Sequence, residues 1–452
     1  MNAKAFSVQQ TPDGGYVICG NQINGSSRSA FLLKTDPEGE TKWVKSFEGD
    51  IASNDQVFLQ TKDSGFILCT NIYNDTLAFY RLNNLGEIVR ITKSHLPVSA
   101  YATCIGYTSD SSLILTGWSY ISQETILVKT DKDGGLLWMK GYRIADPYGS
   151  LLLFASEGIS VFETEDGGFL VSGNCDYDTW YFNFEDSFWL KTNDTGDSLW
   201  VKIITSHSGS RYSSFLCNFN SSRNDETSGI IFGAGTIIQD LIGPIKTYGF
   251  LVKSNADGDT LWSAALGTDL TKFNSVYPVM PYGILLGGYS SDSGSVNGLL
   301  LKTNDQGSLI WQRKFSFDSL QSFATSVYPA NDGGIVLCGY TYAPTTYEYV
   351  PFIIKTDRDG YVYPQGIDDK HPTTSLSPFP NPTKGMAFLN PPGNFRELEV
   401  SDILGNVILR KKIDPNDNST LKIDLSGNPD GIYLLKLKNE NGVRTGKIVI
   451  AK

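Results

Sequence analysis

The stretch FLLKTDPEGETKW, residues 31–43, decides the fold because the chain repeats it. An apolar run ends at Lys34, a short turn contains Gly39, and Trp43 follows four residues later. The phrase returns as FYRLNNLGEIV (79–89), ILVKTDKDGGLLW (126–138), FWLKTNDTGDSLW (188–200), FLVKSNADGDTLW (250–262), LLLKTNDQGSLIW (299–311) and FIIKTDRDGYVY (352–363). Seven copies of one phrase indicate a repeat architecture.

The spacing of the copies predicts a β-propeller. Successive cations lie 47 residues apart at Lys34 and Arg81, and 62 apart at Lys129 and Lys191. Periods of about 40–50 residues are typical of propeller blades, each a four-stranded sheet. A second turn precedes each phrase, as in TPDGGYVICG (11–20). Each repeat is therefore predicted to run from strand A through an Asp-Gly-Gly turn to strand B, then through a variable loop to strand C, a second turn and strand D.

The aromatic residue that closes the phrase is predicted to pack between blades. Five of the eight tryptophans share this position on strand D, and we expect them to fill the wedge between neighbouring blades rather than to form a ligand platform. These are Trp43, Trp138, Trp200, Trp262 and Trp311. Arg90 and Pro364 replace it in repeats 2 and 7, so packing should be weaker there, and YVYP (361–364) is a weak last strand.

The turn motifs and the cysteines favour structural roles. The sequences DKDG (131–134) and DRDG (357–360) resemble pieces of calcium loops, but they lack the closing bidentate carboxylate, so we interpret them as hairpin turns. Cys19, Cys69 and Cys338 share one strand position and are interpreted as buried thiols, with a disulfide between neighbouring repeats as the alternative. No metal site and no cofactor is predicted.

Charge and hydropathy exclude some classes of partner. A net charge of −11 argues against nucleic acid as the main ligand, and no segment is long and apolar enough to span a membrane. The opening MNAKAFSVQQ contains no apolar run of signal-peptide length, although Phe6–Gly20 already belongs to the first repeat. We therefore expect further sequence upstream.

A binding site is expected where the repeats differ. The A–B and C–D turns are short, whereas the B–C and D–A connections are long and varied, above all in repeats 3 to 5. The richest insert, residues 173–189, supplies the candidate ligand-binding residues Tyr177, Trp180 and Tyr181 for stacking on sugar rings or anchoring a protein. The alternative is that these rings pack onto their own blade. Further inserts lie at 143–154 and 341–352.

Catalysis has little support in the sequence. His95, His207 and His371 stand in unrelated contexts, with no zinc-binding helix motif and no nucleophile elbow, and no catalytic residue is assigned. An acidic pair on the B–C/D–A face of a glycan-directed enzyme remains the alternative to a binding module.

The C-terminal part differs from the repeats. Residues 1–364 are predicted to form the seven-bladed propeller, 365–375 a linker, and 376–452 a small antiparallel β-sandwich. Its motifs are FPNPTKG (379–385), DILGNVI (402–408), GIYLLKL (431–437) and GKIVIAK (446–452). In their order and position they resemble the type A C-terminal sorting domain of the type IX secretion system of Bacteroidetes.

The resemblance implies export. Such a domain is recognised by the secretion machinery, which takes the protein across the outer membrane, and a sortase-like protease commonly removes it. Candidate recognition residues are Gly431, Tyr433, Gly446, Lys447 and Lys452, although Gly431 also suits a turn and Tyr433 a core. The repeats resemble propeller arrays of exported bacterial proteins. We therefore expect a secreted or surface-exposed binding or scaffold protein, with a glycan-directed enzyme or a structural spacer as alternatives.

Overall fold

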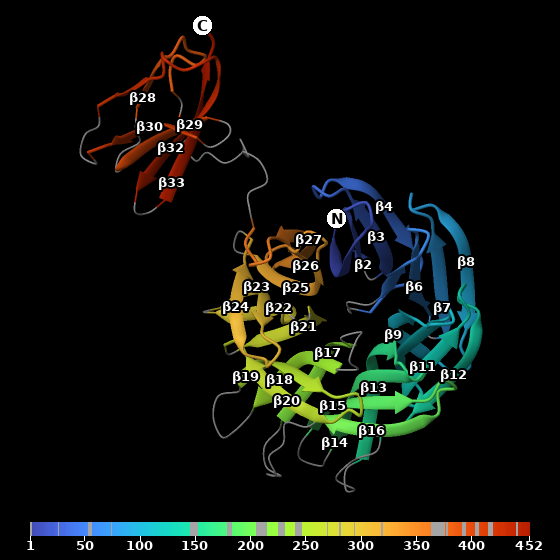
Figure 1. Ribbon diagram of the computed structural model, residues 1–452. Coiled ribbons are helices and arrows are strands. Elements are labelled where there is room, and N and C mark those ends of the chain that lie inside the picture. The colour runs from blue at the N-terminus through green and yellow to red at the C-terminus, as the bar shows by residue number, and fades with distance from the viewer. Residues whose placement is uncertain are drawn as a thin grey trace. The chain divides into compact units, whose positions relative to one another are not determined.

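The computed structural model contains two compact units, residues 1–363 and 364–452. It describes residues 2–25, 27–52, 57–73, 75–144, 152–178, 183–204, 215–224, 231–239, 246–268, 270–279, 282–292, 294–317, 320–362, 376, 378–390, 395–402, 406–414, 419–439 and 442–452. All regular structure in these ranges is β-strand (Figure 1). Within them no helix is long and apolar enough to cross a membrane.

The first unit consists of consecutive antiparallel meanders, one for each sequence repeat. Repeats 1 to 3 contain β1 (Ala3–Gln10), β2 (Tyr16–Asn24), β3 (Ser27–Thr35), β4 (Thr41–Phe47); β5 (Phe58–Gln60), β6 (Phe66–Ile72), β7 (Thr76–Leu82), β8 (Ile88–His95); and β9 (Ala100–Tyr107), β10 (Leu113–Ser119), β11 (Thr125–Thr130), β12 (Leu136–Tyr142). In Figure 1 the meanders follow one another around a common centre.

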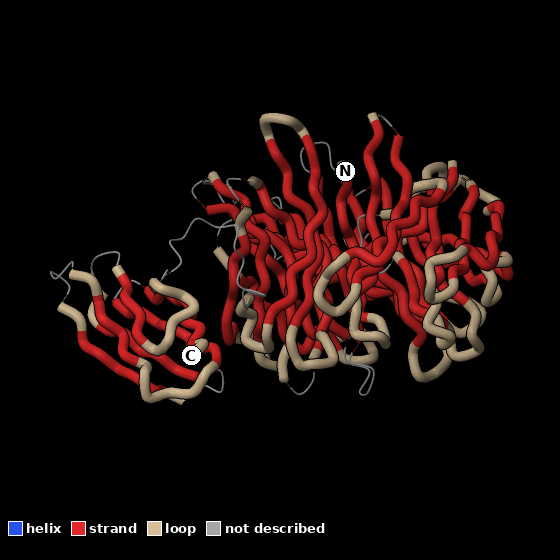
Figure 2. Tube along the Cα trace, turned by 90° about the horizontal axis from the view of Figure 1, so that it is seen from above, coloured by secondary structure: helices blue, strands red, loops and turns tan. Residues whose placement is uncertain are grey.

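The remaining repeats continue this order. Repeats 4 to 7 contain β13 (Leu152–Glu163), β14 (Phe169–Asp178), β15 (Asn183–Thr192), β16 (Ser198–Ile204); β17 (Phe215–Asn224), β18 (Ile231–Gln239), β19 (Lys246–Ser254), β20 (Thr260–Leu266); β21 (Thr271–Pro278), β22 (Ile284–Asp292), β23 (Ser295–Thr303), β24 (Leu309–Phe315); and β25 (Gln321–Pro329), β26 (Ile335–Ala343), β27 (Glu348–Thr356). Repeats 4 and 5 are joined in one sheet by a single parallel bridge between β15 and β17. Figure 2 shows the strands running from one end of the unit to the other, so the connections lie at two opposite ends.

A β-bulge in strand A fixes the glycine of strand B. Six repeats of the described chain carry this bulge, for example between Ala5 and Ser7 in β1. The bulge brings a strand-A carbonyl so close that a Cβ on Gly20 would lie 1.9 Å from the oxygen of Lys4. Gly117, Gly173, Gly288 and Gly339 meet the same obstacle at 1.9–2.2 Å. Only glycine leaves room for this approach.

Hydrophobic packing joins each repeat to the next. Every buried cluster of the first unit draws its residues from two neighbouring repeats, as expected for sheets buried on both faces. Repeats 7 and 1 share such a cluster too, in which Val8 and Ile18 accompany Val336. The serine after the bulge adds a hydrogen bond across the same interfaces. Ser275 Oγ accepts from Val327 N at 3.1 Å, and Ser326 Oγ accepts from Val8 N at 3.4 Å.

The repeated tryptophans pack as the sequence predicts. Each lies partly buried against one of these clusters, and its ring covers the turn glycine of the following repeat. A Cβ on Gly307, for instance, would lie 2.7 Å from the ring of Trp262. Gly39 is the exception, with no atom within 4 Å of its Cβ position. In repeat 2, Arg90 instead points outward and forms an exposed ion pair with Asp133 at 2.8 Å.

The last predicted strand of repeat 7 is not formed in the described residues. Tyr361 and Val362 have no strand pairing, and 363–364 lie outside the described ranges. The ring of Tyr361 packs against the guanidinium of Arg313 at 4.1 Å, so it serves repeat 6 rather than extending the sheet beside β27. The sheet of repeat 7 therefore contains three described strands.

The acidic turn residues form hydrogen-bonded turns, and the turn at 131–134 joins β11 and β12 as the predicted hairpin. Asp131 Oδ1 accepts hydrogen bonds from the backbone N–H of Asp133 and Gly135, and Asp357 does the same in its own turn. Among the described residues no group of three or more His, Cys, Asp or Glu side chains is placed to hold a metal ion.

In five repeats the Asp of the A–B turn pairs with the cation of strand C, as in Lys34 Nζ to Asp13 Oδ1 at 2.9 Å. This pairing explains why the quoted phrase contains a cation.

The shared cysteine position holds buried thiols. Cys19, Cys69 and Cys338 are buried and free, and Cys104 and Cys175 are free as well. The disulfide alternative is therefore wrong for the described cysteines. Burial raises the pKa of the Cys69 thiol far above its usual value.

The second unit contains two sheets around one core. One pairs β28 (Met386–Leu389) with β31 (Leu421–Asp424), and the other has the order β30 (Val407–Lys412), β29 (Glu397–Asp402), β32 (Gly431–Asn439), β33 (Gly442–Ile450). Buried residues of both sheets form a single cluster, which includes Ala387, Ile423, Val400 and Leu435. Two sheets that enclose one apolar core agree with the small β-sandwich that the sequence predicts.

The packing of tryptophan on the following turn can be tested with two glycines. Gly307 and Gly39 both have positive φ, 77° and 92°, so alanine strains the backbone at either site. Only Gly307→Ala also pushes against a ring, which should cost roughly 1–3 kcal/mol more. Urea unfolding of the two variants measures the difference. Equal losses of stability would show that the ring contact does not stabilise the interface.

The ion pair of the A–B turn predicts acid sensitivity. Burial alone would raise the pKa of the Asp166 carboxyl, but hydrogen bonds from Lys191, Thr164 and the Gly168 N–H outweigh it and lower the pKa to about 2. A depressed pKa contributes stability that is complete above about pH 4 and lost as pH falls towards 2. Asp166→Asn should therefore cost about 1 kcal/mol at pH 7, because Lys191 stays buried, and progressively less below pH 4. Unfolding curves at several pH values test this, with Asp194→Asn at an exposed turn position as control.

Candidate functional site

The bulge places one variable residue pair at the same point of each repeat. One residue of the pair is on strand A and has the carbonyl that approaches the strand-B glycine. The other is on strand B, directly after this glycine, and lies opposite the first. We call these two residues the bulge pair. The pairs are Lys4–Asn21, Tyr101–Trp118, Glu157–Asn174, Asn218–Thr236, Lys272–Tyr289 and Phe323–Tyr340. The backbone of this position recurs, while its chemistry changes in every repeat.

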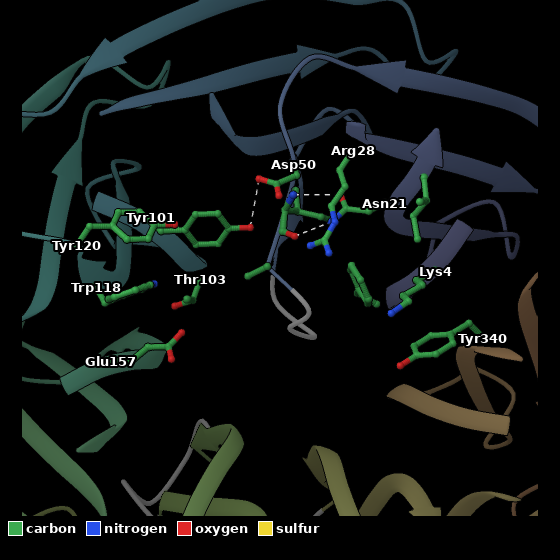
Figure 3. Close-up of a pocket in the computed structure, with 14 residues that line it drawn as sticks. Lys4, Asn21, Arg28, Asp50, Tyr101, Thr103, Trp118, Tyr120, Glu157 and Tyr340 are labelled. Atoms are coloured by element: carbon green, nitrogen blue, oxygen red, sulfur yellow. Dashed lines mark hydrogen bonds between the residues drawn. The ribbon is translucent and has the colours of Figure 1, made fainter. Parts of the chain in front are cut away.

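A cavity of 510 Å³ opens at the end of the unit where these pairs lie. Six of its lining residues belong to bulge pairs of repeats 1, 3, 4 and 7: Lys4, Asn21, Tyr101, Trp118, Glu157 and Tyr340 (Figure 3). The others include Asp50 and Ile51 of a D–A connection and Arg28 beside a B–C loop. The cavity therefore lies at the B–C/D–A end, away from the short turns.

One wall of the cavity is held by side chains of repeats 1 to 3. Asn21 binds Ile51 of the D–A connection twice, donating to its carbonyl at 2.8 Å and accepting from its N–H at 3.1 Å. Asn71 binds Ala102 in the same way in the next repeat. The Tyr101 hydroxyl donates to Asp50 Oδ1 at 3.3 Å, as Figure 3 shows. Burial raises the pKa of the Asp50 carboxyl. The wall is thus built before any ligand arrives.

Aromatic rings occupy two sides of the cavity. Trp118 and Tyr120 lie together at 4.3 Å between ring centroids, and Tyr340 lies on the other side. Behind Tyr340 the rings continue through Phe323, stacked at 5.1 Å, to Tyr289 at 4.9 Å from Phe323. Rings with polar neighbours suit ligands that have apolar faces and hydroxyl edges.

Two cations face the cavity from repeat 1. The Nζ atom of Lys4 lies 4.0 Å from the ring centre of Tyr349 and 4.9 Å from that of Tyr340. Burial and the charge of Arg28 lower the pKa of the Lys4 ammonium. Lys4 and Arg28 therefore concentrate positive charge on this wall.

A second carboxyl with a raised pKa, besides Asp50, lines the cavity. Glu157 lines the cavity on the side of Thr103 and Trp118. Burial and then the nearby Asp176 carboxylate raise the pKa of Glu157 to about 7. At neutral pH this group is accordingly present in both its charged and its protonated form.

The predicted ligand-binding residues are not part of this description. Trp180 and Tyr181 lie outside the described residues, and of Tyr177 the structure describes only the backbone, in β14. Their role stays a prediction. The insert at 341–352 is described in full, and its rings Tyr342 and Tyr349 stack on each other at 5.0 Å. These two rings pack within their parent repeat, whereas Tyr347 of the same insert is exposed.

Sequence reasoning missed the bulge pairs. The signal that marks them is the residue after the strand-B glycine, which is Asn21, Trp118, Asn174, Thr236, Tyr289 and Tyr340 in an otherwise repetitive phrase. A single variable residue of this kind is less conspicuous in the sequence than a long insertion. The strand-A partner is harder to find, since only the bulge brings it opposite.

In the second unit, residues of the quoted motifs form hydrogen bonds that hold the domain together. Asn381 donates to the Lys447 carbonyl at 2.8 Å and accepts from Val449 N at 2.8 Å, which ties FPNPTKG to β33. Tyr433 is buried, and its hydroxyl donates to the Pro429 carbonyl at 2.9 Å.

Of the other candidate recognition residues, two have structural contacts and two are open to solvent. A Cβ on Gly446 would lie 2.6 Å from the Leu376 oxygen, so this glycine allows two strands to approach. Lys452 Nζ donates to the carbonyls of Ser426 and Asn428, both at 2.8 Å. Gly431 has open space around its Cβ position, and Lys447 is exposed. These two remain available to a partner.

Residues 377–451 match the family model of a secretion system C-terminal sorting domain. The tail is therefore similar to the C-terminal sorting domains of a secretion system. This agrees with the resemblance to type IX secretion that its motifs carry, and it places the mature protein at the cell surface or outside the cell. Contact with the secretion machinery follows from the same match. Among curated proteins, none matches the sequence.

Solved structures share the fold of the repeats. An ulvan lyase of polysaccharide lyase family PL25, bound to -[GlcA(1-4)Rha3S]-, aligns with a TM-score of 0.50 and 8% identity over 79% of this chain and 95% of that chain. A second structure of an ulvan lyase of this family aligns with a TM-score of 0.51 and 8% identity, over 79% of this chain and 94% of that chain. This likeness concerns the all-β fold alone.

The titration of Glu157 can be tested through stability. An acid whose pKa is raised by folding weakens the folded state as pH rises from about 4.3, its unfolded value, to about 7. Glu157→Gln should remove this loss. The free energy of unfolding of the variant, relative to that of the wild type, should therefore rise by roughly 1–3 kcal/mol between pH 4 and pH 8. Asp176→Asn should lower the Glu157 pKa and reduce the effect. A difference between variant and wild type that does not change with pH would contradict the assignment.

Proposed function

We propose that residues 1–363 form a closed seven-bladed propeller. Seven repeats supply the blades, and the contacts between repeats 7 and 1 are of the same kind as those between other neighbours. The Ser326–Val8 hydrogen bond repeats the Ser275–Val327 one. Thr325 Oγ1 also donates to the Ala5 carbonyl at 3.0 Å. The short β25–β27 sheet is then the seventh blade.

We further propose that the protein is an exported saccharide-binding protein. The observation that carries this is the cavity, whose size falls within the roughly 300–1,000 Å³ of small-ligand sites and whose walls combine rings with fixed polar groups. Pyranose rings stack their C–H faces on aromatic rings such as Trp118, while hydroxyls bond to groups such as Asn21 and Asp50. A purely structural spacer needs no such concave site. The sorting domain delivers the cavity to where extracellular glycans are.

A second candidate is a glycan-directed enzyme. The specific observation is Glu157, a cavity carboxyl whose pKa of about 7 suits a general acid or base near neutral pH. The solved structures that share the fold include an ulvan lyase. An enzyme would need a second group within reach of the same bond, and Asp50 and Tyr101 are candidates because they line the same cavity.

The saccharide proposal predicts the effect of removing one ring. Trp118→Ala should lower affinity at least tenfold for any oligosaccharide that binds, since stacking on this ring is lost. Tyr282→Ala, an exposed ring in an A–B turn, should leave affinity unchanged. A glycan array followed by titration calorimetry on the hit measures both. Binding that survives Trp118→Ala, or an array without any hit, would overturn the proposal.

The two candidates differ in turnover. Incubating the array hit with the protein and measuring newly formed reducing ends separates them. A binding protein leaves the oligosaccharide intact. Cleavage that disappears in Glu157→Gln would instead establish the enzyme.

Export should depend on the C-terminal unit. In a host with type IX secretion, and with a signal peptide added to both forms, the full chain should reach the medium or the cell surface. The form ending at residue 363 should remain in the periplasm with the circular dichroism of a folded β protein. Secretion of the truncated form would contradict the assignment.

A further inference from the structure

Two cations line the cavity without a carboxylate bonded to them in the described part of the chain. Lys4 and Arg28 both face the space from repeat 1, and neither forms an ion pair with a described acidic residue. Their like charges oppose each other, because Arg28 contributes to the lowered pKa of Lys4. Two neighbouring cations are costly to hold together unless an anion lies between them.

Lys4 is held in this position by the fold. Its carbonyl is the one that approaches Gly20, so its backbone cannot move without breaking the bulge. Its ammonium rests over the rings of Tyr349 and Tyr340, at 4.0 and 4.9 Å. The rings orient the charge through their π faces, which accept no strong hydrogen bond, and no described protein group accepts one from this ammonium. A half-buried ammonium with free donors is prepared for an anionic acceptor.

The described acidic groups of the cavity compensate the charge of this wall only in part, because one carboxylate, Asp50, faces two cations. Asp50 feels the charge of Arg28, but the hydrogen bond that the structure gives to its carboxylate comes from the Tyr101 hydroxyl. Glu157 lies on the side of Thr103 and Trp118, and its pKa of about 7 leaves it only partly charged at neutral pH. The side formed by Lys4, Arg28 and Tyr340 therefore stays positive.

We propose that Lys4 and Arg28 form a subsite for the anionic group of an acidic saccharide, a carboxylate or a sulfate ester. This rests on the proposed saccharide-binding function and specifies its ligand class. The sugar that carries the anion packs beside Tyr340, and further units reach across to Trp118. Neutral glycans then bind more weakly, because the two cations remain without a counter-charge.

The test compares saccharides and variants on the full chain. An array of neutral, uronate-containing and sulfated oligosaccharides is screened first, and the best hit is titrated by calorimetry at low and high NaCl. We expect anionic hits whose affinity falls with salt. Lys4→Gln and Arg28→Gln should each lower that affinity about tenfold and flatten the salt dependence. Comparing uronate with sulfate hits identifies which anion is preferred.

Lys272→Gln is the matched control. Lys272 occupies the same bulge-pair position in repeat 6 but does not line the cavity, so its loss should leave affinity unchanged. Arg28 is exposed, so Arg28→Gln should fold normally and tests the subsite even if Lys4→Gln fails to fold.

The outcomes separate the two proposals. Anionic hits that depend on Lys4 and Arg28 support the subsite. Neutral hits that ignore both substitutions but are lost in Trp118→Ala overturn the subsite and leave saccharide binding intact. No binding to any member of the array overturns both.

Discussion

The structure of the repeats depends on one close approach. In five repeats a strand-A carbonyl comes so near the strand-B backbone that a Cβ would lie within 2.2 Å of it, and only glycine satisfies this constraint. The bulge that produces the approach also aims a serine at the next repeat, as in Ser275 to Val327. The same local geometry therefore shapes each of these sheets and links it to its neighbour, and in repeats 1, 3, 4 and 7 it brings one or both residues of the bulge pair to the cavity.

The features that stabilise the repeats and the side chains that line the cavity lie at opposite ends of the strands. At one end, hairpin turns, ion pairs and tryptophans repeat with little change, and their partners lie within the same or the following repeat. At the other end the bulge pairs differ in every repeat, from Lys4–Asn21 to Tyr101–Trp118. A rigid and repetitive frame allows this variation, because the turns, ion pairs and tryptophans at the other end do not depend on which side chains form the bulge pairs. The C-terminal unit serves export and has its own hydrophobic core.

Much of the fold was predictable because it repeats. Recurrence of FLLKTDPEGETKW indicated the number of repeats, the turn at Gly39 and the interface role of Trp43. The partner of Lys34 was not predictable, since Asp13 lies 21 residues earlier and only the sheet brings them together. The cavity was missed for the same reason. Bulge pairs combine residues such as Lys4 and Asn21 that no local pattern connects, whereas long inserts are visible in the sequence but lie partly outside the described structure.

The most direct test of this account is hydrogen exchange measured by mass spectrometry, with and without the best-binding saccharide. The account predicts slower exchange in peptides that contain the bulge pairs of repeats 1, 3, 4 and 7, such as residues 2–6, 100–104 and 155–158, and no change in the turns at 130–135 and 192–197. Protection confined to the turns, or to residues 376–452, would contradict it.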